Sequence, residues 1–350
     1  FGGITNNGDT SLILGCGDYS SENSDVFNGP YSSFHSYDSP EYQDKWGQSM
    51  YTICQSEIDQ FKTWWQCENG LLTTAECIGV NQPSPEVMQR ITSWPAHGNI
   101  SNGEGFFLSP FFDNPSGPNG EDGVYSPESD GDYPLIKGCC ATYMVQNDDA
   151  GPKTTSNTVP MGVEMHYMFY QYKTWDYLDY TTFIEVIAIN RSDDAISDFG
   201  YGMYAHADVG YYADDYFGVD STNNMMYIYN GDNFDEDNGG IPGYGENPPA
   251  IGFVALDQNL SGATLYDWQD VWVDLHPTVF NPTSPFTGDK RGIMSTEYGT
   301  FNSGEVIKQT YAIVFSDAGD HLENAQNVID LAAEIKLFHD NESETPCQDG

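Results

Sequence analysis

The sequence predicts a mainly β protein, an elaborated antiparallel β-sandwich with long loops, a short helical insertion and a C-terminal helix. Strand-forming aromatic residues are abundant, with 24 Tyr, 19 Phe and 7 Trp among 350 residues. Turn-forming residues are also plentiful, with 36 Gly and 19 Pro. Because β-rich chains often exceed about 200 residues as one unit, we expect a single domain over residues 1–340 and a polar tail over 341–350.

The expected elements begin with short strands and loops in residues 1–40, where apolar stretches alternate with Gly, Asn and Ser clusters. A helical insertion into the β scaffold is expected at about residues 55–92. Its first helix spans Gln55–Gln66, which carries apolar residues at helical spacing. Its second helix begins after Ser84, where Pro85 occupies the first helical position.

A series of strands follows from Met161 onward, because segments rich in β-branched and aromatic residues each end in turn residues. The expected strands are Val163–Tyr172, Thr181–Asn190, Phe199–Ala207, Met225–Tyr229, Ala250–Leu256, Asp270–Leu275 and Ile307–Phe315. An amphipathic helix is expected from Asp320 to about His339, with Val328 and Ile335 on its buried face. This order of elements favours an antiparallel sandwich.

The charge of the chain excludes several classes of partner. There are 53 Asp and Glu against 11 Lys and Arg, a formal net charge of −42. Nucleic acids and anionic membrane surfaces are bound through Lys and Arg, so a chain this acidic repels both. No segment approaches the roughly 20 consecutive apolar residues that span a bilayer. We therefore expect no nucleic-acid partner and no membrane insertion.

Seven cysteines predict an oxidising, extracellular setting. They form no CxxC pair and accompany no His cluster at zinc spacing, which argues against structural zinc. Pairing among Cys54, Cys67 and Cys77 would cross-link a loop-rich region, whereas the adjacent Cys139 and Cys140 are expected to bond elsewhere. The connectivity stays open, and an odd number leaves one thiol free or paired outside the chain. Buried reduced cysteines in a cytosolic protein are the alternative.

A succession of short motifs resembles a known family. The motifs are Trp94-Pro95-Ala96-His97-Gly98, Pro110-Phe111-Phe112-Asp113, Asp122-Gly123-Val124-Tyr125-Ser126-Pro127, Gly131-Asp132-Tyr133-Pro134, Gly162-Val163-Glu164-Met165, Ile189-Asn190-Arg191-Ser192, Ala207-Asp208-Val209-Gly210, Asp214-Asp215-Tyr216-Phe217-Gly218-Val219-Asp220 and Tyr229-Asn230-Gly231-Asp232. In this order they resemble a module of large secreted cell-surface proteins of Bacteroidota, which are exported by type IX secretion and carry a sorting domain. The resemblance covers most of the chain and implies an extracellular or cell-surface location, but no defined activity. Because Phe1-Gly2-Gly3 resembles the interior of the module, we expect a further strand before it.

Carboxylates gathered in Gly-rich loops predict calcium sites, since Ca²⁺ prefers oxygen ligands. In the first loop, the resemblance implies a D-x-N-x-D-G-x-Y calcium pattern, which an insertion interrupts in this chain. The second loop gathers four carboxylates within 13 residues, which would repel one another without a cation. The candidate ligands are Asp113, Asn119, Glu121, Asp122, Asp130 and Asp132 in the first loop, and Asp208, Asp214, Asp215 and Asp220 in the second. A solvated acidic surface is the alternative in both, and it is the interpretation that we favour for Asn230–Gly240.

Catalytic motifs are missing from the sequence, which contains no GxSxG, HExxH or GxxxxGK[ST]. His206, two residues before Asp208, is a candidate metal ligand or acid/base partner, although a structural role is the favoured interpretation. We predict a non-enzymatic structural or adhesive cell-surface protein that is stabilised by calcium. Self-assembly into filaments or a surface lattice would use strand exchange through residues 1–14, and other cell-surface proteins are further candidate partners.

The alternative function is a carbohydrate-binding module or a glycoside hydrolase that acts on extracellular polysaccharide. Among 53 acidic residues, some carboxylate pairs lie at the separation that glycosidases use by chance alone. Glycans are therefore also candidate partners. The aromatic residues that could stack on sugar rings are Trp64, Trp65, Trp175, Tyr211, Tyr212 and Trp268.

Overall fold

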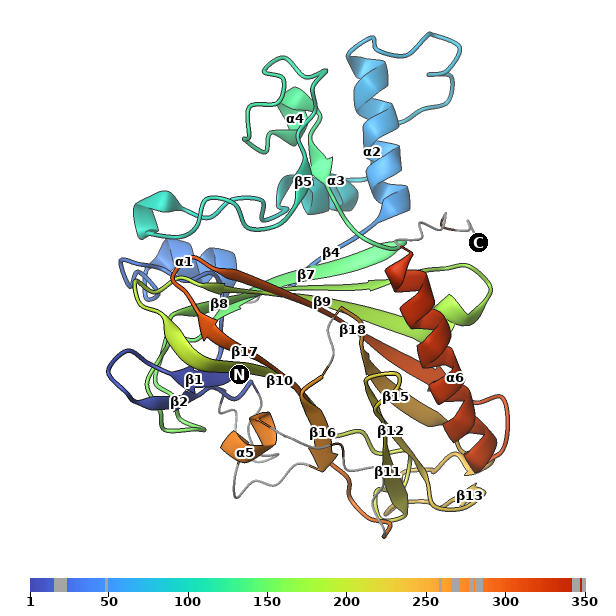
Figure 1. The fold of residues 1–350 in the computed structure, drawn as a ribbon. Helices are drawn as coiled ribbons and strands as arrows, with labels where there is room; N and C mark the ends of the chain where they lie inside the picture. Colours follow the sequence, from blue (N-terminus) through green and yellow to red (C-terminus); the bar gives the residue numbers. More distant parts are fainter. Residues whose placement is uncertain are drawn as a thin grey trace.

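Two antiparallel sheets form a sandwich in this computed structural model, which describes residues 1–15, 24–47, 50–257, 260–265, 271–276, 280, 286–341 and 347 (Figure 1). Within these residues, the larger sheet has nine strands, and β4 (Tyr51–Cys54) and β3 (Phe27–Asn28) both pair with β7 at one end. Its order from the other end is β11 (Asp215–Asp220), β12 (Met225–Asn230), β15 (Ala250–Ala255), β18 (Val306–Ser316), β9 (Thr181–Asn190), β8 (Val163–Gln171), β7 (Cys140–Asn147).

The smaller sheet has five strands among the described residues. Its order is β16 (Gly262–Leu265), β17 (Gly292–Phe301), β10 (Ile196–Ala205), β1 (Gly2–Ile4), β2 (Thr10–Leu12). Two short pairs lie outside both sheets, β13 (Phe234–Asp235) with β14 (Gly245–Glu246), and β5 (Phe111–Phe112) with β6 (Tyr133–Pro134). The predicted mainly β sandwich with a C-terminal helix is confirmed.

Side chains of the larger sheet alternate between two cores, because successive residues of a strand point to opposite faces. In β9, Ile184 and Val186 belong to the core between the two sheets, together with Phe199 and Met294 of the smaller sheet. Phe183 belongs to a second core on the opposite side, which we call the outer face of the larger sheet. Both faces of this sheet are therefore partly covered, one by the smaller sheet and the other by helices and loops.

The C-terminal helix α6 (His321–Asp340) covers one part of the outer face, over β12, β15 and β18 (Figure 1). Asp320 caps its first turn, since its carboxylate accepts the backbone N–H groups of Leu322 and Glu323. Val328, Ala332 and Ile335 are buried against the sheet. The predicted helix from Asp320 to about His339 is confirmed.

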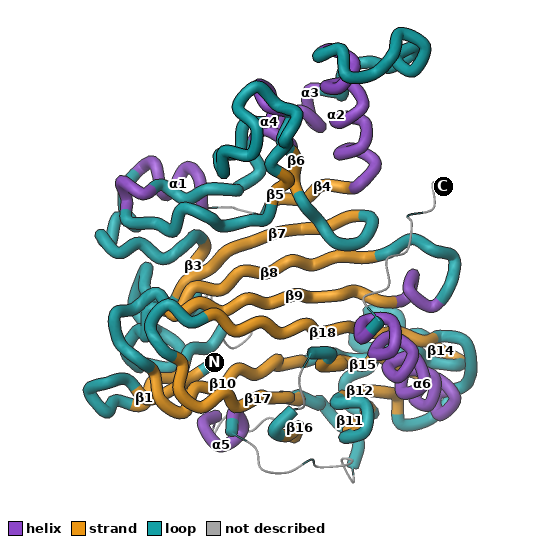
Figure 2. The backbone as a smooth tube through the Cα atoms, turned by 45° about the horizontal axis from the view of Figure 1, so that its top comes forward, coloured by secondary structure: helices purple, strands orange, loops and turns teal. Residues whose placement is uncertain are grey.

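The helical insertion covers the β7 side of the outer face and extends beyond it (Figures 1 and 2). Within the predicted bounds of about 55–92 lie α2 (Gln55–Glu68) and α3 (Pro85–Thr92), and α1 (Pro40–Trp46), η1 (Ile100–Asn102) and α4 (Pro127–Asp130) flank them in the chain. Both predicted helices of the insertion are confirmed by α2 and α3. Ser84 caps α3 by accepting the N–H of Val87, as its position before Pro85 predicts. Another short helix, η2 (Tyr177–Tyr180), connects β8 to β9.

One predicted strand, Asp270–Leu275, is wrong. The segment Val271–Leu275 forms the short helix α5, and residue 270 lies outside the described residues. Leu275 is buried against the smaller sheet beside Gly2 and Gly200. The periodicity of so short an apolar run does not distinguish a strand from a helix, and tertiary contact decides between them.

Residues 1–14 are paired within the chain. Strand β1 pairs with β10 and with β2, and the backbone N–H of Ile13 donates to the carbonyl of Phe1. Strand exchange through this segment would therefore require the β1–β2 hairpin to leave β10.

Among the described residues, no helix combines the length and apolarity needed to cross a bilayer.

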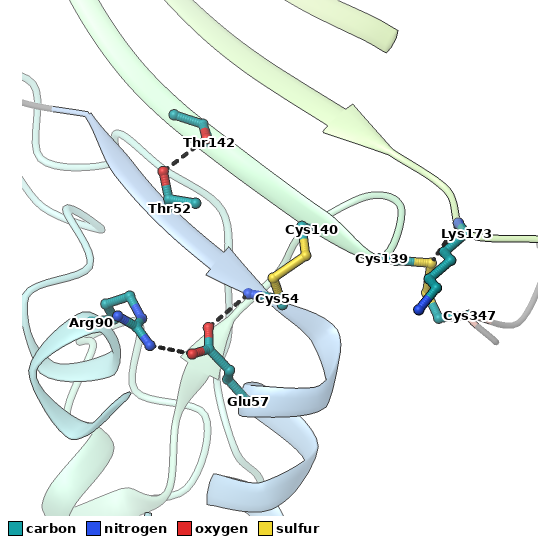
Figure 3. The surroundings of a disulfide bond; sticks show 9 residues. All are labelled: Thr52, Cys54, Glu57, Arg90, Cys139, Cys140, Thr142, Lys173 and Cys347. Atoms are coloured by element: carbon teal, nitrogen blue, oxygen red, sulfur yellow. Dashed lines mark hydrogen bonds and ion pairs between the residues drawn. A yellow bond between two sulfur atoms is a disulfide. The ribbon is translucent and has the colours of Figure 1, made fainter. Parts of the chain in front are cut away.

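Three disulfides form among the described residues, and two of them join distant parts of the chain. Cys54 bonds to Cys140 and Cys139 to Cys347 (Figure 3), and Cys67 bonds to Cys77. The adjacent cysteines 139 and 140 thus bond elsewhere, as expected, and one of the pairs predicted among residues 54, 67 and 77 is formed. The bond to Cys347 ties the predicted polar tail to the start of β7, and Cys16 lies outside the described residues.

Candidate metal centre

Three carboxylates gather around the start of β11, those of Asp214 and Asp215 from the second predicted loop and that of Asp235 from outside it. Asp215 is fully buried, and one of its oxygens accepts the N–H of Val209 at 3.0 Å while Oδ1 has no partner. Asp235, 1 % exposed on β13, accepts the N–H groups of Tyr211 at 2.6 Å and Tyr244 at 2.5 Å. The backbone thereby positions both carboxylates, but it leaves an oxygen of Asp215 without a hydrogen bond.

Asp214 adds a second unpartnered oxygen to this cluster. Its Oδ2 accepts a hydrogen bond from the side-chain amide of Asn230 at 3.2 Å, whereas its buried Oδ1 has no partner. Burial raises the pKa of Asp214 to about 6, and the neighbouring carboxylate of Glu236 raises it too. Burial likewise raises the pKa of Asp215 to about 8, with the charges of Asp214, Asp208 and Asp235 contributing. A cation bound among these groups would stabilise the ionised carboxylates and would therefore lower the pKa values of both Asp214 and Asp215.

Asp208 lies in a neighbouring cluster with His206 and Asp289. The imidazole Nε2 of His206 is 2.7 Å from Oδ1 of Asp289 and 3.7 Å from Oδ1 of Asp208. One ligand atom from each residue lies within 4.8 Å of the others, so the three side chains could share an ion. Arg291 already pairs with Asp289 at 2.9 Å, and both carboxylates are exposed. His206, for which we favour a structural role, therefore lies in an ion-paired cluster.

Asp220 lies apart from the other candidates of the second loop. It ends β11, whereas Asp215 begins it, and five residues of strand span about 16 Å. Its carboxylate accepts the N–H of Thr222 at 2.7 Å and the amide of Asn223 at 3.1 Å, which closes the turn into β12. The structure thus separates Asp220 from the Asp214–Asp215 pair.

The first predicted loop brings Asp130 and Asp132 into the interior. Asp132 is fully buried and accepts the N–H groups of Asn114 at 2.9 Å and Ser126 at 2.7 Å. Burial raises its pKa, and the charges of Asp113 and Asp130 add to the shift. Asp130 accepts both the backbone and the side-chain N–H of Asn119 at 3.0 Å.

Among the described residues of the first loop, Asp113 supplies the one buried side-chain oxygen that has no hydrogen-bond partner. Its Oδ2 accepts the N–H of Gly123 at 2.6 Å, whereas Oδ1 is buried and unpartnered. Glu121 and Asp122 are exposed, and Asp122 accepts the N–H of Val124. Most carboxylates of this loop therefore hold the backbone in place, and it is a weaker candidate for a cation than the second loop.

Asp235 is the candidate ligand that the sequence analysis assigned to solvent. The segment Asn230–Gly240 folds back so that Asn230 and Asp235 are both buried. The interpretation of a solvated loop is therefore wrong for Asp235, while Glu236 and Asp237 are exposed. Nothing in the local pattern marks Asp235, because the carboxylates of Asp214 and Asp215 and the N–H of Tyr211 belong to a segment about 20 positions or more away in the chain.

The comparisons with known proteins yield no family. No family model matches, and no curated protein matches. Among solved structures, heparan sulfate lyase HepC from Pedobacter heparinus aligns with 8% identity over 51% of this chain and 20% of its own, at a TM-score of 0.27. A family GH92 inverting mannosidase from Bacteroides thetaiotaomicron aligns with 10% identity over 56% of this chain and 24% of its own, at 0.25.

A GH36 α-galactosidase from Geobacillus stearothermophilus gives a similar result, with 9% identity over 51% of this chain and 24% of its own at a TM-score of 0.26. The chain thus spans a quarter or less of the length of these three enzymes. Likenesses at this level carry no argument about function, which must come from the residues of the chain itself.

Proposed function

We propose that this chain is a non-enzymatic structural or adhesive protein of the cell exterior whose fold is stabilised by calcium. The observation that carries the proposal is the fully buried Asp215, which has an unpartnered oxygen and lies near the carboxylates of Asp214 and Asp235. Burying ionised carboxylates is costly unless a positive charge compensates them. A divalent cation supplies that charge and occupies the free oxygens.

The donor set favours Ca²⁺ over other common ions. Asp214, Asp215, Asp235 and Glu236 offer only oxygen atoms, the ligands of a hard cation. Ca²⁺ accepts six to eight oxygens in flexible geometry, which suits a site assembled from two segments of the chain, whereas Mg²⁺ demands a near-ideal octahedron. Because these ligands meet only in the folded chain, calcium binding would stabilise the fold.

The disulfides support an extracellular location. Three cross-links form among the described residues, and such bonds persist in oxidising compartments. Extracellular fluids also supply the calcium that a site of modest affinity requires, since extracellular modules bind it at about 10⁻⁴–10⁻³ M. The resemblance to secreted Bacteroidota proteins agrees with both arguments.

We also propose that copies of this protein assemble with one another by strand exchange through the β1–β2 hairpin. In the described structure β1 and β2 pair with their own chain, so an exchanged assembly must first release this hairpin. The hairpin is held to β10 by the three residues of β1 alone, which makes release less costly than for a long strand. Light scattering at rising CaCl₂ tests assembly, and a monomer under every condition would contradict it.

Thermal unfolding with CaCl₂ and with EGTA tests calcium stabilisation. At a concentration 100 times the dissociation constant, a bound ion adds about 2.7 kcal/mol to the free energy of unfolding. We expect a higher melting temperature in CaCl₂, a smaller effect of MgCl₂, and loss of most of the calcium effect in Asp215→Asn. Asp9→Asn removes the same charge from an exposed turn and should keep the effect. Equal melting temperatures in CaCl₂ and EGTA for the unmodified chain would overturn the proposal.

A further inference from the structure

A pocket of about 410 Å³ opens onto the outer face of the larger sheet, between residues 107–111 and strands β7, β8 and β9. These strands run between the helical insertion and α6 (Figure 2). Its lining includes Phe107, Ser109, Phe111, Tyr143, His166 and Glu185. The volume falls within the range of about 300–1,000 Å³ that is usual for small-molecule sites.

Aromatic rings form the wall of the pocket on the side of the insertion. Phe107 is 62% exposed, although its ring is held edge-on against His97 and Phe106 at centroid distances of 5.7 and 4.9 Å. A second ring of this wall, that of Phe111, packs edge-on against His97 and Tyr125. An apolar ring that is rigidly placed yet open to solvent is suited to stacking against a ligand.

A charged group lies on the floor of the pocket. Glu185, 9% exposed on β9, is paired with the ammonium groups of Lys137 and Lys308, the latter at 2.8 Å. Burial alone would raise the pKa of Glu185, but the two lysines hold it below its usual value. Glu185 therefore stays ionised as a hydrogen-bond acceptor, with two donors beside it.

The rest of the floor is fixed by a buried network. His166 is bound on both ring nitrogens, by the Tyr143 hydroxyl at 2.7 Å and by Glu164 at 2.7 Å. Glu164 in turn accepts hydrogen bonds from Arg191 at 2.6 and 3.0 Å and from the N–H of Tyr31 at 2.8 Å. This network leaves no ring nitrogen of His166 for acid/base work, but it holds the pocket in one shape.

Ser109 carries the polar group of the wall that still needs a partner. It is 4% exposed, it lines the pocket, and its hydroxyl makes no hydrogen bond. A buried polar group without a partner destabilises the fold, because it has lost its hydrogen bonds to water. A ligand hydroxyl or a bound water in the pocket would satisfy it.

We infer that this pocket binds an uncharged saccharide, and that the adhesive contact of the proposed function is made there. The C–H face of a pyranose ring stacks on Phe107, while sugar hydroxyls donate to Glu185 and accept from Ser109. Few ligand classes combine an apolar face with this density of hydroxyl groups. The net charge of −42 repels polyanionic glycans, which favours a neutral sugar.

The aromatic residues that the sequence analysis named as sugar contacts do not line this pocket. Trp65 is buried in the insertion and Trp175 and Tyr212 are exposed elsewhere, while Trp268 lies outside the described residues. The pocket therefore uses a different aromatic residue, Phe107, and places it within reach of a carboxylate.

Binding of neutral oligosaccharides tests the inference on the full chain in CaCl₂. The probes are hexamers of β-linked glucose, mannose and galactose and a polyanionic hexuronate, measured by isothermal titration. We expect at least one neutral hexamer to bind, with a loss of tenfold or more in Phe107→Ala. Phe34→Ala removes a similarly exposed ring, 66% exposed and outside the pocket, and should bind normally.

Glu185→Gln would leave two lysines without their carboxylate and could disturb folding, so Phe107→Ala is the deciding variant. Ser109→Ala is the second variant, and we expect it to lose less affinity for the hexamer. Absence of binding to every neutral probe, preference for the hexuronate, or binding that survives Phe107→Ala would each overturn the inference. The calcium response of the same samples separates it from the proposed function. An intact response without sugar binding rejects the pocket alone.

Discussion

A β-carbon at position 210 would lie 1.7 Å from Oδ2 of Asp235, so only glycine fits where the segment before β11 crosses this buried carboxylate. Gly210 also has a φ of +77°, in the left-handed region that favours glycine. The next residue, Tyr211, donates its N–H to the same carboxylate at 2.6 Å. This contact joins two segments of the proposed calcium site.

Gly210→Ala should therefore destabilise the protein and weaken its calcium response. Strain and displacement of Asp235 together should lower the free energy of unfolding by about 1–3 kcal/mol. Gly239→Ala is the matched control, because Gly239 has a φ of +57° but open space around it. Its loss should be about 1 kcal/mol and its calcium response unchanged. Equal effects of the two substitutions in urea titrations with CaCl₂ would contradict the packing argument.

Arg191 should be essential for stability because it compensates the fully buried Glu164. Arg191→Met leaves this charge without its guanidinium and should cost about 3–5 kcal/mol in the free energy of unfolding. Arg90→Met, which breaks a more exposed pair with Glu57, should cost less than about 1 kcal/mol. The double variant Arg191→Met/Glu164→Gln should recover part of the loss in urea unfolding, and full additivity would argue against direct compensation.

The disulfides that close the longest and the shortest loop should differ in how much they contribute to the free energy of unfolding. Cys139 and Cys347 are 208 residues apart, whereas Cys67 and Cys77 are 10 apart. Since a longer loop has more entropy to lose, removal of the first bond by two Cys→Ser substitutions should cost about 2–3 kcal/mol more than removal of the second. Urea unfolding of both double variants measures the difference. A larger loss from the 67–77 pair would contradict the prediction.

Asp148 should make stability fall as the pH rises. Burial raises the pKa of its carboxyl to about 6, although the N–H groups of Met161 and Val163 oppose the shift. The raised pKa means that the folded state binds the proton more tightly than the unfolded state, whose Asp titrates near 4. The stabilisation is therefore present below pH 4 and is lost between pH 4 and pH 6.

Comparison with Asp148→Asn isolates this effect from the other carboxylates. Between pH 4 and pH 7, the free energy of unfolding of the unmodified chain should fall by about 1–3 kcal/mol relative to the variant. Lys153 and Asp149, the other charged groups near Asp148, are present in both proteins. A difference that does not change with pH would show that Asp148 titrates normally.

Local patterns determined much of the fold. The helical spacing in 55–66 and 320–339 predicted α2 and α6 to within about two residues, because an amphipathic repeat and an N-cap are local features. The strand Thr181–Asn190 was predicted at its observed bounds, since aromatic and β-branched residues precede a clear turn. The sequence also placed Asp214 and Asp215 among the candidate ligands.

Tertiary structure decided what local patterns could not. Val271–Leu275 became a helix because of what Leu275 packs against, Cys54 paired with Cys140 across 86 positions, and Asp235 was bound by the N–H of Tyr211 across 24 positions. In each case the deciding free energy comes from burial and from contacts between residues distant in the chain. A periodic pattern within a short segment carries no information about such contacts.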